Sequence, residues 1–93
     1  MASTTRIPDT EKHVLVREYD DFSMRQKGRH EELEEQITAS DNLPMRRRMA
    51  MLNLVEMAII GVADMDMVDD LSVNQLTAFT SSVLAISGQR DNA

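Results

Sequence analysis

The sequence predicts a small all-α protein that is centred on a buried, apolar second helix. Apolar residues recur at three- and four-residue spacing in two long segments, and cap residues with a proline separate these segments from their neighbours. The chain has 93 residues and only three aromatic ones, so its core must be aliphatic and methionine-based. We expect one domain over residues 1–93, either a three-helix arrangement or a helical hairpin with an N-terminal helical arm.

The N-terminal third carries the weakest helical pattern. Residues 1–8 show no periodicity and are expected to form a polar arm. Pro8, Asp9 and Glu11 suit a first helical turn, which predicts helix one over residues 9–39. Its middle is polar and contains Gly28, which costs about 1 kcal/mol relative to alanine, so a break near residue 28 is a second option. The β-branched stretch at 13–16 can alternatively form a short strand.

A central helix is predicted over residues 43–68. Asp41 and Asn42 are cap residues, and Pro44 suits a first turn but not a helix interior. Apolar residues then occupy nearly the whole helix circumference, which indicates burial on nearly every side.

The third helix, over residues 73–87, has the best-specified start. Ser72 and Gln75 have the spacing of a capping box, and Leu71 and Leu76 have the spacing of a hydrophobic staple. Gly88 suits the end of the helix, and residues 88–93 are expected to form a polar tail.

Methionine is the most unusual feature of the composition, since six of the eight lie between Met45 and Met67. Methionine fills irregular cores, and it is also common on adaptable binding surfaces. Two flanking helices do not easily cover so much apolar perimeter, so part of the central helix is predicted to be a protein interface. The predicted interface residues are Met49, Met51, Leu54, Met57, Ala58, Met65 and Val68.

The charges on the predicted central helix oppose its own dipole, with cations at its start and anions at its end. The residues concerned are Arg46, Arg47, Arg48, Asp64, Asp66, Asp69 and Asp70. Three arrangements can compensate them, and all three stay open. The arginines can lie beside Glu34 and Glu35 in a hairpin, two copies of the helix can pack antiparallel, or the arginines can hold an anion.

No catalytic residue, cofactor site or metal site is predicted. A calcium loop counted from Asp64 fails, because it needs glycine at position six and glutamate at position twelve, where Asp69 and Gln75 stand. His13 and His30 are isolated, and no nucleophile or phosphate-binding motif is present. The chain also lacks cysteine, which removes thiolate chemistry and disulfides.

The net charge of −6 disfavours nucleic-acid binding, which depends on cationic side chains. Neither a signal peptide nor an apolar run long enough to cross a membrane is visible, so a soluble protein of the cytoplasm or of a virus particle is expected.

These observations predict a non-enzymatic protein that binds protein chains, itself or another. The first hypothesis is a homo-oligomeric helical adaptor or a structural subunit of a larger, viral or phage, particle. The alternative is an acidic regulator that docks on the basic groove of a larger enzyme. A third hypothesis is an oligomeric nucleic-acid-binding subunit that uses the arginine cluster.

Overall fold

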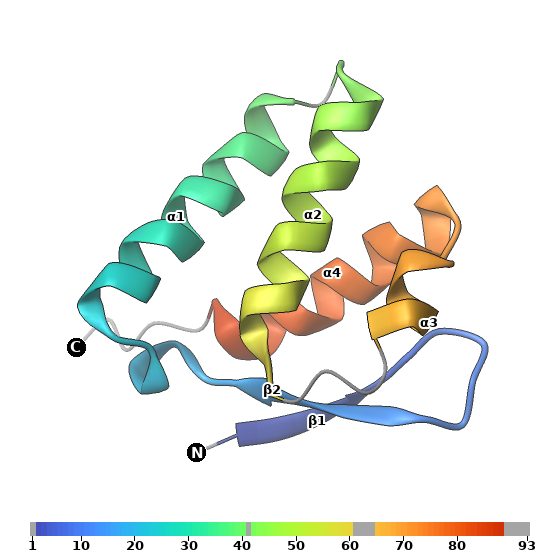
Figure 1. Ribbon diagram of the computed structural model, residues 1–93, viewed down its shortest axis with the longest axis horizontal. Helices are drawn as coiled ribbons and strands as arrows, with labels where there is room; N and C mark the ends of the chain where they lie inside the picture. Colours follow the sequence, from blue (N-terminus) through green and yellow to red (C-terminus); the bar gives the residue numbers. More distant parts are fainter. Residues whose placement is uncertain (1, 41, 61–64, 89–93) are drawn as a thin grey trace.

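The computed structural model describes residues 2–40, 42–60 and 65–88 of the chain. It contains a three-stranded antiparallel sheet with the helices packed on one side (Figure 1). The all-α prediction is therefore wrong, and the fold is a small α/β globule. None of the helices in the described ranges is long and apolar enough to cross a membrane.

The sheet is built from two strands near the N-terminus and a third from the middle of the chain. The strands are β1, Ala2–Arg6, β2, His13–Arg17, and β3, Ile59–Ile60, in the order β1-β2-β3. The expected polar arm is thus an edge strand, and the expected start of helix one is the central strand. Burial alternates along β2, because Val14 and Val16 face the core whereas Leu15 is 45% exposed. This period-two pattern distinguishes a half-buried strand from a helix.

A loop over residues 7–12 joins β1 to β2. The backbone N–H of Ile7 donates to the carbonyl of Lys12, and Asp9 adopts a positive φ of 60°. Pro8 and Asp9 were expected to begin a helix, but proline and aspartate are also favoured in turns. The side chain of Gln75 donates to the Asp9 carboxylate, which ties the turn to the last helix.

Helix α1, Met24–Ala39, begins much later than predicted, after a 3-10 turn at Tyr19–Asp21. Its start is fixed by a capping box in which Ser23 and Gln26 bond to each other's backbone N–H. Gly28 lies on the exposed side of this continuous helix, so the break considered near residue 28 does not occur.

The predicted central helix is divided into three elements. Helix α2, Pro44–Ala58, begins with proline at its first turn as expected. The chain then becomes extended at β3, because Ile59 and Ile60 pair with Val16 and Leu15 of β2. A short helix, α3, Met65–Asp69, follows beyond residues 61–64, which lie outside the described ranges. The β-branched isoleucines fit a pleated sheet better than a helix end.

Helix α4, Val73–Ser87, has the predicted range, and the predicted capping box between Ser72 and Gln75 is confirmed. It packs against β1, β2 and α2, while α1 packs against α2 (Figure 1). Its inward side carries Leu76, Phe79 and Val83, which are at most 1% exposed. The described part of the predicted tail, Gly88, closes the helix, and residues 89–93 lie outside the described ranges.

Candidate functional site

Most of the predicted interface residues fill the chain's own core. Met51, Leu54 and Ala58 of α2 and Val68 of α3 are at most 3% exposed. Helix α4 packs against the side of α2 that was expected to be free. Met57 is partly buried, and nothing is described for the side chain of Met65. The four buried residues therefore hold the fold together. Among the predicted interface residues whose side chains are described, only Met49 is more than half exposed, at 52%.

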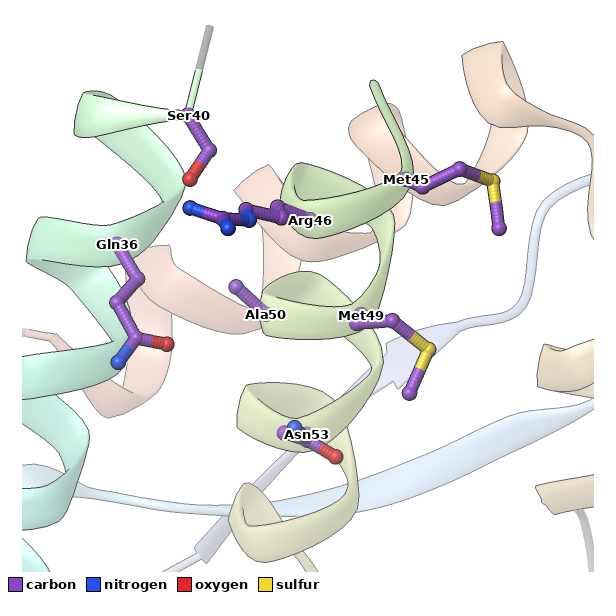
Figure 2. A pocket seen from close by; sticks show the side chains of 7 residues that line it. All are labelled: Gln36, Ser40, Met45, Arg46, Met49, Ala50 and Asn53. Carbon is purple, nitrogen blue, oxygen red and sulfur yellow. The ribbon is translucent and has the colours of Figure 1, made fainter. Parts of the chain in front are cut away.

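The exposed side of α2 forms a different surface, together with the end of α1. An open groove of about 480 Å³ lies there. We call this surface the α1–α2 face, and its lining residues are Gln36, Ser40, Met45, Arg46, Met49, Ala50 and Asn53. Figure 2 shows Arg46 extending from α2 toward Ser40 at the end of α1, while Met45 and Met49 project from α2 on the side away from α1.

The α1–α2 face follows from the sequence of α2. Ala50, Leu54 and Ala58 are spaced one turn apart and face inward, so Met45 and Met49, which project from the other side of the helix, face solvent. Met45 is 71% exposed and was not among the predicted interface residues. The position of this methionine in the first turn, beside the arginines and before the buried residues begin, could have indicated its exposure.

One member of the arginine cluster, Arg48, is compensated in a way that none of the three sequence hypotheses describes. Arg48 Nη2 donates to the backbone carbonyls of Asp69 and Leu71, at 3.3 and 3.4 Å. These carbonyls lie at and just beyond the C-terminal end of α3, where a cation is favourable. Arg47 lines a smaller pocket of about 180 Å³ between α2 and the start of α4. Arg46 faces the groove (Figure 2).

The predicted acidic cluster lies partly outside the described ranges, since it includes Asp64. Asp66, Asp69 and Asp70 are exposed, and the contact with Arg48 uses the backbone of Asp69 rather than its carboxylate. The predicted placement of these acids at the end of one long central helix is wrong, because Asp66 lies in the first turn of α3, Asp69 is its last residue and Asp70 follows it.

A buried polar network joins α1 to α4 and was missed by the sequence interpretation of His30. The Nε2 atom of His30 lies 2.8 Å from Ser87 Oγ, and both side chains are fully buried. The Nδ1 atom lies 2.6 Å from Glu34 Oε1, a close polar contact rather than a well-aligned hydrogen bond. The rings of Tyr19 and Phe22 pack around the imidazole, at centroid distances of 6.1 and 5.4 Å.

A serine in contact with a histidine that in turn contacts a carboxylate is the catalytic arrangement of many hydrolases, in which the serine must reach the substrate. Ser87 and His30 are both 0% exposed, so a substrate has no access to this serine. The network is suited to fixing the position of α1 against α4. Within the described ranges, no group of three or more His, Asp or Glu side chains is arranged to hold a metal ion.

The sequence matches no protein-family model, and neither a curated protein nor a solved structure is significantly similar to it.

Proposed function

We propose that this chain is a non-enzymatic protein–protein interaction module that binds its partner through the α1–α2 face. The observation that carries this proposal is the exposure of two neighbouring methionines, Met45 at 71% and Met49 at 52%, beside an open groove. Unbranched and polarizable, methionine adapts its shape to a partner surface.

The chemistry of the groove suits a protein partner. The apolar part is small and is surrounded by the polar side chains of Gln36, Arg46 and Asn53. An apolar centre with a polar rim is the usual anatomy of a protein interface. The volume of about 480 Å³ accommodates a few side chains of a partner helix, which would lie along α2.

A non-enzymatic role is supported by the position of the most reactive arrangement in the described ranges. Ser87, His30 and Glu34 link two helices inside the molecule, so they contribute to the fold rather than to a surface site. The proposal includes a role as an adaptor or as a subunit of a larger assembly, and the lack of cysteine is compatible with a reducing compartment such as the cytoplasm.

The proposal is tested by oxidative footprinting of the methionines, read by mass spectrometry. The chain is oxidised once in an extract of the cells that make it and once as the dilute purified protein. Met45 and Met49 should react several-fold more slowly in the extract. Met24, which is 81% exposed and does not line the groove, provides the matched control and should react equally in both. If each of the three methionines is oxidised at the same rate in the extract as in the purified protein, the proposal is overturned.

A second function, docking of an acidic surface on the basic groove of a larger enzyme, is favoured by the exposure of Asp66, Asp69 and Asp70. The double variant D66K/D69K separates the two functions. The acidic surface would be favoured if the methionines of D66K/D69K lose their protection from oxidation in the extract while Met49 of M45E keeps it. The reverse pattern would favour the α1–α2 face.

A further inference from the structure

The exposed side of α2 carries a regular stripe of residues. Arg46, Met49, Asn53 and Glu56 are all exposed and follow one another at spacings of three, four and three residues. Residues at these spacings lie on one side of a helix. We call them the α2 stripe, and the first three of them also line the groove of the α1–α2 face.

The two charges of the α2 stripe oppose the dipole of their own helix. Arg46 lies in the first turn, where the free N–H groups repel a cation, and Glu56 lies in the last turn, where the free carbonyls repel an anion. Neither side chain has an ion-pair or hydrogen-bond partner within residues 2–40, 42–60 and 65–88. Both charges therefore remain uncompensated by the described part of the chain.

The α2 stripe is also symmetric about its middle. Arg46 and Glu56 are each five residues from Met51, and Met49 and Asn53 are each two residues from it. When a helix with this arrangement meets an antiparallel copy of itself, every basic position faces an acidic one and each methionine faces an asparagine. Such self-complementarity is what a two-fold interface between identical subunits requires.

We infer that the partner of the α1–α2 face is a second copy of this chain, with the two α2 helices packed antiparallel about a two-fold axis level with Met51. This inference rests on the proposed function and names the partner of the same face. Arg46 then lies opposite Glu56 of the partner subunit, and Glu56 lies opposite the partner's Arg46.

The dimer reverses the unfavourable helix electrostatics. Arg46 comes to lie near the C-terminal carbonyls of the partner's α2, and Glu56 near the partner's free N–H groups, which is the favourable placement for each charge. Between the charged ends, each Met49 packs beside Asn53 of the partner subunit, at the edge of the groove next to Ala50. The charged pairs thus fix the antiparallel direction, and the methionines supply the apolar contact.

The test compares charge-reversal variants by sedimentation equilibrium and light scattering of the purified full chain. The wild type should form a dimer. R46E and E56R should each raise the dissociation constant at least tenfold, because two opposite-charge pairs per dimer become like-charge pairs. The double variant R46E/E56R should restore the dimer, and so should an equimolar mixture of the two single variants, which would form a heterodimer.

The same variants show whether a loss of dimer is only a loss of folding. Each single reversal places a charge favourably with respect to its own helix dipole, so the monomer should unfold at the same or a higher urea concentration. R25E, which makes the same charge change at an exposed position near the start of α1, is the matched control and should leave the dissociation constant unchanged.

Two results would overturn the inference. The first is a wild type that stays monomeric at chain concentrations up to about 1 mM, the concentration scale for weak association. The second is failure of both the double variant and the mixture to restore the dimer. If the chain is monomeric while Met45 and Met49 are still protected in the cell extract, the two-fold dimer fails and the proposed function stands. If neither dimer nor protection is found, both fail.

Discussion

The Nε2 atom of His30 and the Oγ atom of Ser87 lie 2.8 Å apart, although 57 residues separate them in the sequence. The first belongs to the middle of α1 and the second is the last residue of α4. Because both side chains are fully buried, each satisfies a polar group that water cannot reach. This hydrogen bond therefore holds α1 against the end of α4.

Replacing Ser87 by alanine should therefore destabilise the protein by about 1–3 kcal/mol, the cost of leaving a buried imidazole nitrogen without its partner. Urea unfolding followed by circular dichroism measures the change. Ser81→Ala, at an exposed position on the same helix, is the control and should change stability by less than about 0.5 kcal/mol. Equal effects of the two substitutions would show that the His30–Ser87 bond contributes nothing to the folded state.

The sequence predicted α4 correctly because every local signal there agrees. Ser72 and Gln75 cap the helix, Leu71 precedes the cap, and Leu76, Phe79 and Val83 form the inward stripe. A structure specified by contacts between residues three or four positions apart is visible without knowledge of the rest of the fold.

Only β2 was considered from the sequence, as the alternative short strand at 13–16, because long-range pairing creates the sheet. β1 consists mainly of small polar residues, so its two faces differ little in hydropathy. β3 is only two residues long, and Ile59 pairs with Val16 from a distant part of the chain. Three of the predicted interface residues, Met51, Leu54 and Ala58, are buried in the chain's own core, in a helix that packs against both α1 and α4.

The sheet itself makes a sharp prediction at two neighbouring residues. Val16 is 0% exposed, whereas Leu15 points to the open face and is 45% exposed. Val16→Ala should cost about 2 kcal/mol through lost apolar burial and the cavity it leaves. Leu15→Ala removes more atoms but should cost less than about 1 kcal/mol, because much of that side chain is already in contact with water. Chemical denaturation of both variants provides the measurement, and a larger cost at Leu15 would contradict the strand register.

The two capping boxes should contribute equally and independently. Ser23 and Ser72 each accept a hydrogen bond of 3.2 Å from the glutamine N–H three residues ahead, and both glutamine side chains bond back to the serine N–H. Ser23→Ala and Ser72→Ala should each cost about 1 kcal/mol, and the double variant about twice that, since the sites share no partner. Thermal and urea unfolding check this additivity. A double variant no less stable than either single one would show that the two helix starts are coupled.

Two glycines should respond in opposite directions to the same substitution. Gly28 lies on the exposed side of α1, and a Cβ built there meets no atom within 4 Å, so Gly28→Ala should stabilise the protein by about 0.5–1 kcal/mol through helix propensity. Gly88 follows α4, where its N–H donates to the carbonyl of Leu84 at 2.8 Å. A Cβ at Gly88 would lie 2.8 Å from that same carbonyl oxygen, so the backbone must shift and the hydrogen bond must weaken. Gly88→Ala should therefore lower the urea midpoint while Gly28→Ala raises it, and a stabilising Gly88→Ala would show that α4 does not end as described.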